Sequence, residues 1–238
     1  MLFKKEGIIN APFCDMNLNN VAFISFAFSF VCLLVILIDV IRFPQKMWIM
    51  NIVWPVTALY SGPLGLWAYY RIGRKLVRKG SAGKQLHNQQ KPYWQSIVVA
   101  ALHCGSGCTL GDIVAQLFLF FVPVVLFGSR LFGEWGIDYV FAFAIGIIFQ
   151  YYSIIPMKNL APQKAIVAAL KADTVSLTAW QIGMYGWMAI CVFLIFHHRL
   201  RAFEPVFWLM MQIAMLLGFI TSYPVNWWLI KKGIKEKM

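Results

Sequence analysis

Charged residues are scarce in this chain, and acidic residues are the scarcest of them. Asp and Glu together number 9 of 238 residues, and all charged residues make up 13% of the sequence, against about 25% in an average soluble domain. The longest polar stretch has only roughly 25 residues, too few for a soluble domain. These absences exclude a soluble globular protein. A hydrophobic share of 61% and a mean hydropathy of +0.69 predict a multi-pass membrane protein instead.

Several sequence patterns are also missing. No run alternates apolar and polar residues, which excludes a transmembrane β-barrel. The first apolar run begins late and is too long for a signal peptide, so we expect it to stay in the protein. No internal repeat supports an inverted-repeat transporter. No nucleotide loop and no paired nucleophile and base are visible, so we do not expect an enzyme.

Apolar windows long enough to cross a bilayer recur along the chain. They predict an all-α, polytopic helix bundle of about six transmembrane helices, forming a single integral-membrane domain over residues 1–238. Pro55, Gly62 and Pro63 interrupt the second window and predict a kinked helix there. The six predicted spans are Val21–Ile41, Met47–Tyr70, Ala100–Phe121, Ile137–Ile155, Thr174–Phe196 and Phe207–Ile230.

Basic residues outnumber acidic ones by 21 to 9, and their placement predicts an orientation. With six spans and both termini cytoplasmic, sixteen basic residues lie inside and five outside, as the positive-inside rule requires. The expected location is the inner (plasma) membrane of a bacterium. A basic loop over about residues 71–95 contains no acidic residue and is suited to anionic lipid headgroups. It lacks a folded module with interleaved aromatics, so we expect no nucleic-acid partner.

The segment "HCGSGCTLGD" concentrates polar and soft-ligand side chains within a predicted helix over about residues 96–125. Cys104, Cys108 and Asp112 fall four residues apart on one helical face, and His103 borders that face. Thiolate and imidazole groups favour copper(I) or zinc(II), so these residues predict a metal site. Asp112 is a ligand, an orienting group or a proton carrier in this hypothesis, because a carboxylate inside a bilayer is costly.

Structural roles for the same segment stay open. Gly107 and Gly111 form a small-residue stripe that would let another helix approach closely, with the two cysteines as small apolar side chains. If the glycines break the helix, Thr109 becomes an N-cap and Asp112 completes a capping box. Thiol redox chemistry is a further alternative, although four-residue spacing on a helix is poor disulfide geometry.

Polar side chains at the start of the fifth predicted span are expected to support this site. Asp173 is interpreted as an N-cap or a first-turn acid that follows a short interfacial helix. Thr174, Thr178 and Gln181 recur at helical spacing, so we expect one polar face turned toward protein or water.

The signature "LHCGSGCTLGDIVA" resembles that of a bacterial family of integral-membrane proteins known only as a domain of unknown function. Longer segments are similar to the same family, namely "MNIVWPVTALYSGPLGLWAYYRIGR", "KADTVSLTAWQIGMYGWMA" and "WLMMQIAMLLGFITSYPVNWWLIKKGIKEKM". The resemblance implies a multi-pass architecture and brings no established activity with it. Acidic residues are common in that family where Gln116 and Gln181 stand here, which puts a proton-relay role of those two positions in doubt.

Two functional hypotheses follow. The first is a small-solute transporter, or a handler of copper or zinc, that uses His103, Cys104, Cys108 and Asp112. The second is a non-transporting assembly factor, or a factor that binds lipid or a protein partner, whose signature serves helix packing and capping.

Overall fold

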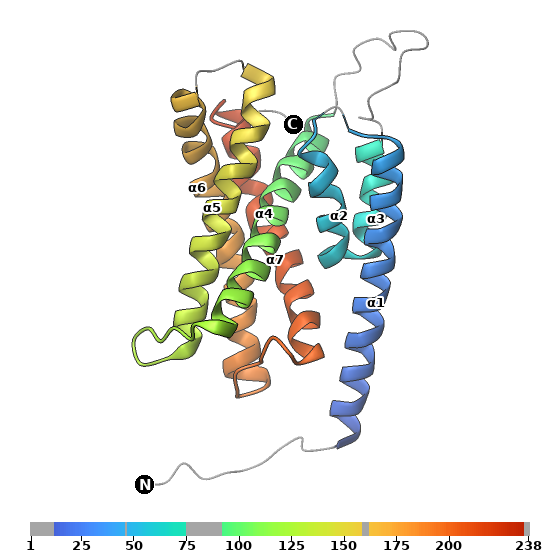
Figure 1. Ribbon diagram of the computed structural model, residues 1–238, viewed down its shortest axis with the longest axis vertical. Coiled ribbons are helices and arrows are strands. Elements are labelled where there is room, and N and C mark those ends of the chain that lie inside the picture. Colours follow the sequence, from blue (N-terminus) through green and yellow to red (C-terminus); the bar gives the residue numbers. More distant parts are fainter. Residues whose placement is uncertain (1–11, 46, 75–91, 159–161, 236–238) are drawn as a thin grey trace.

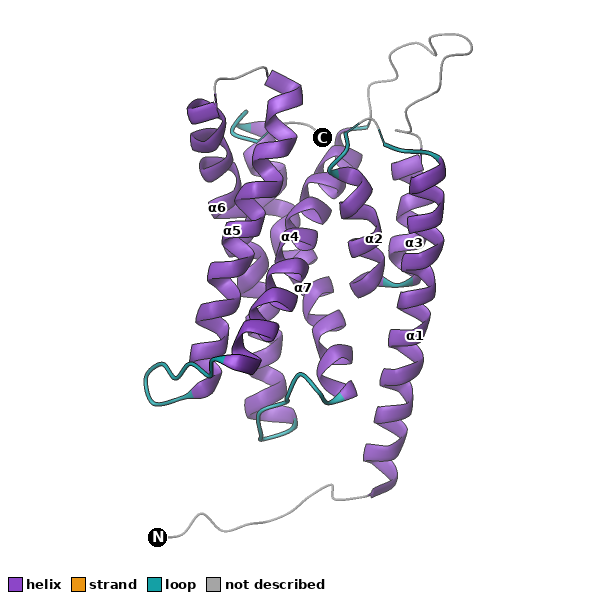
Figure 2. Cartoon of the chain, in the orientation of Figure 1, coloured by secondary structure: helices purple, strands orange, loops and turns teal. Residues whose placement is uncertain are grey.

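The computed structural model describes residues 12–45, 47–74, 92–158 and 162–235, and these are almost entirely helical, with no named strand (Figure 2). Most of the predicted basic loop lies outside the described residues. The five longest helices are α1 (Pro12–Arg42), α4 (Tyr93–Phe121), α5 (Arg130–Lys158), α6 (Pro162–Ile190) and α7 (Pro205–Lys231). Within the described part of the chain, these five are long and apolar enough to cross a membrane.

The second predicted span differs from the prediction, because it is a hairpin instead of one kinked helix. It consists of α2 (Met50–Ser61), α3 (Pro63–Ala68) and a π-helical turn, η1 (Tyr69–Gly73). The reversal occurs at Gly62, whose φ of 52° lies in the left-handed region that glycine adopts readily. Pro63 then starts α3 at a position where its missing N–H costs nothing.

Contacts at the end of α1 show that the hairpin returns to the level at which it started. The hydroxyl of Tyr69 donates to Asp39 Oδ2 at 2.7 Å, and Arg74 forms an ion pair with Asp39 Oδ1 at 3.3 Å. The rings of Trp54 in α2 and Tyr69 in η1 lie 5.6 Å apart. A single spanning helix would place Trp54 and Tyr69 about 22 Å apart, so α2 and α3 run antiparallel (Figure 1).

The tip of the hairpin lies halfway along α1. A Cβ atom on Gly62 would be 3.0 Å from the hydroxyl of Ser29, which is near the middle of the apolar segment Asn17–Arg42. The side-chain amide of Gln212 in α7 donates to the carbonyl of Leu59 at 3.2 Å, which satisfies one of the free carbonyls where α2 ends. Non-helical backbone at such depth is tolerated only against protein or a water-filled cavity.

The order of the helices sets which segments share an end of the bundle. We call the end at the top of Figure 1 the upper end; α1, η1, α5 and α7 end there, and α2, α4 and α6 begin there. The connections α4–α5 and η3–α7 lie at the lower end, where η3 (Cys191–Ile195) is a π-helical turn that extends α6. α1 begins at the lower end, whereas six spans would start and finish at the same end.

α4 is the central helix of the bundle. In its most apolar window 78% of the residues are buried inside the protein, against 22–39% in the other four long helices. α6 is one continuous helix that includes the short interfacial helix predicted before it. Asp173 is therefore in the interior of α6 and is not a cap, which corrects the prediction.

Candidate functional site

The signature residues lie on one unbroken helix. α4 runs through the glycines without interruption, so the predicted break does not form. The hydroxyl of Thr109 donates to the carbonyl of Gly105 at 2.8 Å, one turn earlier in the same helix. Thr109 is therefore not an N-cap, and Asp112 sits in the helix interior, where the backbone amides are already bonded.

The four predicted metal ligands face different neighbours. His103 is buried against α5, with its Nε2 atom 3.4 Å from the hydroxyl of Ser153. Cys108 faces α6, where the amide nitrogen of Gln181 lies 3.9 Å from its sulfur. Within the described residues, no three His, Cys, Asp or Glu side chains form a group that could hold a metal ion. The geometry gives no support to one copper or zinc site formed by His103, Cys104, Cys108 and Asp112.

The two signature glycines lie where α4 packs against α5. A Cβ atom on Gly107 would be 3.2 Å from the Cα of Gly146, and one on Gly111 would be 2.4 Å from the Cα of Ala142. Real Cβ atoms essentially never come within 3.0 Å of such a neighbour, so any larger residue than glycine at position 111 would push the two backbones apart. Small residues at four-residue spacing permit this kind of close helix contact.

Five buried polar side chains meet in the upper half of the bundle, and we call them the Lys235 cluster. The ammonium of Lys235 donates to Asn226 Oδ1 at 2.8 Å and to Cys104 Sγ at 3.0 Å. The thiol of Cys104 donates in turn to Asp173 Oδ1 at 3.1 Å. Ser176 completes the cluster, because its hydroxyl lies 3.3 Å from the ammonium and donates to Asn226 Oδ1 at 3.0 Å. A cation and a carboxyl group thus share one buried hydrogen-bond network.

A turn at the end of α7 places Lys235 in this network. Gly233 has a φ of 68°, and its N–H donates to the carbonyl of Ile230 at 3.1 Å. The N–H of Ile234 donates to the carbonyl of Leu229 at 3.0 Å. This pair of bonds is the Schellman motif, which ends a helix and reverses the chain. The reversal directs Lys235 back into the bundle, where its side chain is only 2% exposed.

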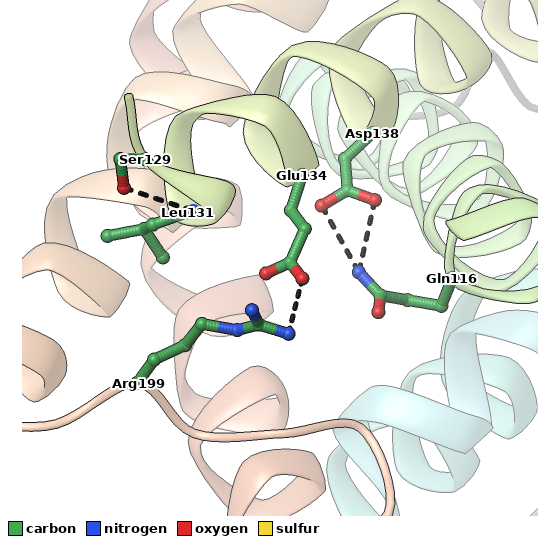
Figure 3. Close-up of polar contacts among 6 residues, drawn as sticks. All are labelled: Gln116, Ser129, Leu131, Glu134, Asp138 and Arg199. Atoms are coloured by element: carbon green, nitrogen blue, oxygen red, sulfur yellow. Dashed lines mark hydrogen bonds and ion pairs between the residues drawn. The ribbon is translucent and has the colours of Figure 1, made fainter. Parts of the chain in front are cut away.

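A second group lies in the lower half of the bundle and is acidic. Gln116 donates to both oxygens of Asp138 at 3.3 and 3.4 Å, and Arg199 pairs with Glu134 at 2.5 Å (Figure 3). We call these four residues together with Asp112 the carboxylate cluster. It holds three carboxyl groups and one arginine. Asp112 and Asp138 are close enough to interact electrostatically.

Asp112 is the member of this cluster without a hydrogen-bond partner. Its side chain is 5% exposed, and neither carboxyl oxygen has a partner among the described residues. It lines a cavity of about 220 Å³. The other residues that line this cavity come from α1, α2, α4 and α7, and include Phe26, Tyr60, Trp208, Met211 and Gln212.

Thr174, Thr178 and Gln181 lie along one face of the continuous helix α6, and they become more buried from Thr174 to Gln181. Asp173 and Gln181 are buried, but Thr174 is on the exposed surface and bonds to the carbonyl of Leu170 within its own helix. Thr178 lies between these environments, with its hydroxyl 3.0 Å from that of Tyr139 on α5. This face is therefore exposed at Thr174 and contacts α5 and α4 farther along, at Thr178 and Gln181.

Several residues of the two clusters have no role in the sequence-based prediction, among them Glu134, Asp138 and Lys235. Glu134 and Asp138 are four residues apart in α5, and an acidic residue inside a predicted apolar span was an available signal. In the sequence, Lys235 is one of four lysines in the last eight residues. Its burial depends on the turn at Gly233, and nothing in the composition of that basic tail marks one lysine as different from its neighbours.

Comparison with known proteins identifies a family without an assigned function. No curated protein and no solved structure matches the chain. A family model described as a domain of unknown function, DUF4396, matches residues 93–235. The match begins at α4 and ends at Lys235, so it includes every residue of the Lys235 cluster and of the carboxylate cluster, whereas α1 and the hairpin precede it. Since the match covers more than half of the sequence, the chain belongs to the DUF4396 family.

Proposed function

We propose that this protein is a membrane transporter that moves a small solute, with Asp112 and Asp138 exchanging a proton or a small cation. The observation that carries this proposal is the buried carboxyl group of Asp112, which has no partner among the described residues and belongs to a residue that lines a cavity. An ionised carboxylate in an apolar interior is strongly disfavoured unless it is paired or hydrated. A proton, a cation or water in the cavity would supply the missing partner.

The hairpin supports a role in transport because it shapes this cavity. Tyr60, two residues before the hairpin tip, and Gln212 line the cavity together with Asp112. They also line a neighbouring cavity that reaches Ser25, Ser29 and the tip itself. Broken helices whose ends face a cavity at membrane depth are typical of solute sites in transporters. Here the half-depth hairpin leaves room below its tip for such a site.

The remaining carboxyl groups support a route from Asp112 to the lower end. Asp138 is about 12 Å along α5 from its start, and Asp112 is about 13 Å along α4 from its end. The two carboxyl groups thus lie at similar depth. Glu134 is one turn nearer the lower end and is paired with Arg199. A proton or cation entering from that end would meet Glu134 before Asp138 and Asp112.

A soft-metal substrate is less well supported than a proton or hard cation. Cys104 is engaged by Lys235, and a neighbouring ammonium competes with any metal ion for the same sulfur. Cys108 and His103 face different helices. Asp112 lines one cavity and Glu134 and Asp138 line the next, and carboxylate oxygens prefer hard cations.

The charge distribution supports an orientation with the upper end cytoplasmic. Basic residues at upper helix ends are Arg42, Arg71, Arg74, Lys158, Lys231 and Lys232, whereas Arg130, Arg199 and Arg201 lie at the lower end. By the positive-inside rule the upper end faces the cytoplasm, in the inner membrane of a bacterial cell. The carboxylate cluster then opens toward the outside.

Proton flux in proteoliposomes tests the proposal. Purified protein is reconstituted with a trapped pH indicator, and a potassium diffusion potential set with valinomycin drives protons inward. The wild-type protein should acidify the lumen faster than empty liposomes do. Asp112→Asn and Asp138→Asn should reduce the rate to the level of empty liposomes, because an amide cannot exchange a proton near neutral pH.

Glu204→Gln is the matched control, because Glu204 also lies at the lower end, directly before α7, and outside the carboxylate cluster. It should leave the flux unchanged. The transport proposal is wrong if wild-type vesicles conduct no protons and if an imposed sodium or potassium gradient drives no flux of that cation either. The glycine contacts of α4 would then favour the assembly-factor alternative.

A further inference from the structure

The Lys235 cluster has the geometry of a binding site for an ammonium group. Four acceptors surround the Lys235 nitrogen, from α4, α6 and α7. They are Asn226 Oδ1 at 2.8 Å, Cys104 Sγ at 3.0 Å, Ser176 Oγ at 3.3 Å and the carbonyl of Ala100 at 3.5 Å. A lysine ammonium has three N–H donors, so the site offers at least one acceptor for each of them.

The charge of the site also suits a single positive ion. The carboxyl group of Asp173 lies behind Cys104 and accepts a hydrogen bond from its thiol, so the cation and the carboxylate are separated by one sulfur. Both ionic side chains are fully enclosed, with exposed fractions of 2% for Lys235 and 0% for Asp173. Without the ammonium, this carboxylate would be a buried charge lacking a counter-ion, which is strongly unfavourable.

Lys235 enters the site from outside the bundle helices. It follows the Schellman turn after α7, whereas all four of its acceptors belong to long helices. The acceptor set is therefore held by α4, α6 and α7 independently of the segment that carries Lys235. Removing the lysine side chain should empty the site without dismantling its walls.

We infer that Cys104, Asp173, Ser176 and Asn226 form a selective site for ammonium or a small primary amine, which the tethered Lys235 ammonium occupies as a built-in competitor. A tethered group acts at an effective concentration in roughly the millimolar range. Free amine therefore binds the wild-type protein poorly and binds readily once the lysine side chain is absent. This inference does not depend on whether the protein transports a solute.

Thermal unfolding of Lys235→Ala in detergent, with methylammonium chloride as the probe, tests the inference. The variant should melt well below the wild type. Methylammonium should raise its melting temperature in a saturable way, by about 5–10 °C at a hundredfold excess over the dissociation constant. The wild type and Lys232→Ala should not respond, because Lys232 is on the exposed surface beside the same turn. Sodium and tetramethylammonium chloride at equal ionic strength serve as ion controls.

Alkylation of Cys104 gives a second readout that does not depend on melting. The thiol is 1% exposed beneath Lys235, so a small alkylating reagent should label it slowly in a chain whose other cysteines are replaced by alanine. Lys235→Ala should raise the labelling rate about tenfold, because opening of the site no longer has to displace the tethered ammonium. Methylammonium should reverse most of that increase.

Asn226→Ala, added to Lys235→Ala, removes the shortest contact of the ammonium and should abolish both effects of methylammonium. The inference would also be supported if folded Lys235→Ala is recovered only when methylammonium is present during purification. The inference is overturned if methylammonium neither stabilises Lys235→Ala nor protects Cys104. It is equally overturned if sodium or tetramethylammonium does so to the same extent.

Discussion

The Lys235 cluster and the carboxylate cluster share helix α4 but treat buried polar groups in opposite ways. Every residue of the Lys235 cluster has at least one hydrogen-bond partner, although Asp173 Oδ2 has none among the described residues, and its one carboxyl group is balanced by one ammonium. The carboxylate cluster has three carboxyl groups and one arginine, and Asp112 has no partner among the described residues. Cys104 and Asp112 are only about two helical turns apart.

This difference indicates that one part of α4 contributes mainly to stability and another part mainly to function. A paired buried charge is costly to disturb, because removing one partner leaves the other uncompensated. An unpartnered carboxyl group already carries that cost, so it is retained for another reason, such as a ligand or a proton. Substitutions should therefore destabilise the upper cluster strongly and the lower cluster weakly, with the opposite ranking for activity.

The two clusters lie in opposite halves of the bundle, and the topology of the helices can be tested by an experiment with only two possible outcomes. Reporter domains fused at Met1, Gly128 and Met238 should place the first two on one side of the membrane and the third on the other. The reason is that the hairpin of α2 and α3 returns to its starting side, so that only the five helices that are long and apolar enough among the described residues would cross. A reporter at Met1 on the same side as Met238 would mean that the second segment crosses, as six spans require.

Lys235→Met should cause the largest loss of stability among single substitutions in the two clusters. It leaves Asn226 and Cys104 without their ammonium donor and Asp173 without a buried counter-charge, and removing one partner of a buried charge pair costs about 3–5 kcal/mol. Thermal unfolding in mild detergent measures the loss, and Lys232→Met is the exposed control. Adding Asp173→Asn should restore part of the stability, since it removes the uncompensated charge. Equal melting of the two methionine variants would show that Lys235 is not part of the folded core.

Gly111→Leu should be the next most damaging substitution, because its side chain would collide with the backbone of Ala142 in α5. Overpacking of this kind costs about 1–3 kcal/mol or more. Gly136→Leu is the matched control, since a Cβ atom on Gly136 meets nothing within 4 Å. Yield of folded protein and melting temperature should fall for the first variant and hold for the second. Similar behaviour of both would contradict close packing of α4 on α5.

Apolar windows predicted the long helices well, because length and hydropathy alone define a span. They failed at the second window, where hydropathy is the same for a crossing helix and for a hairpin. The charge count could not reveal the error either. With five spans instead of six, Lys4 and Lys5 leave the more basic side, and Arg42 and Lys46 join it. The split of sixteen to five is therefore unchanged.

The candidate site was predicted in part, because helical spacing correctly placed Cys104 and Asp112 on a buried face of α4. Spacing could not say which neighbours those side chains meet. Cys104 meets Lys235, which is 131 residues away along the chain, and Asp112 lines a cavity together with residues of α1, α2 and α7. Contacts of this kind depend on tertiary packing and on a turn at Gly233, so local sequence patterns carry little information about them.

Asp112→Asn should have the smallest effect on stability and the largest on activity. The carboxyl group caps no helix, because α4 is continuous through it, and it accepts no hydrogen bond from any described residue. Removing its charge relieves an unfavourable burial, so the melting temperature should stay the same or rise. Asp112→Ala should behave alike, since alanine favours a helix interior by several tenths of a kcal/mol over aspartate.

Both variants should nevertheless lose proton flux, because neither side chain can exchange a proton near neutral pH. Measuring melting temperature and flux on the same preparations separates the two roles of a buried carboxyl group. A structural Asp112 would make Ala unstable, by about 1 kcal/mol or more, and leave Asn active. A functional Asp112 keeps both variants folded and inactive, whereas Lys235→Met, in the partnered cluster two turns away, is strongly destabilised. If instead Asn conducts protons like the wild type, Asp112 has no role in transport, and the contrast between the two clusters concerns packing alone.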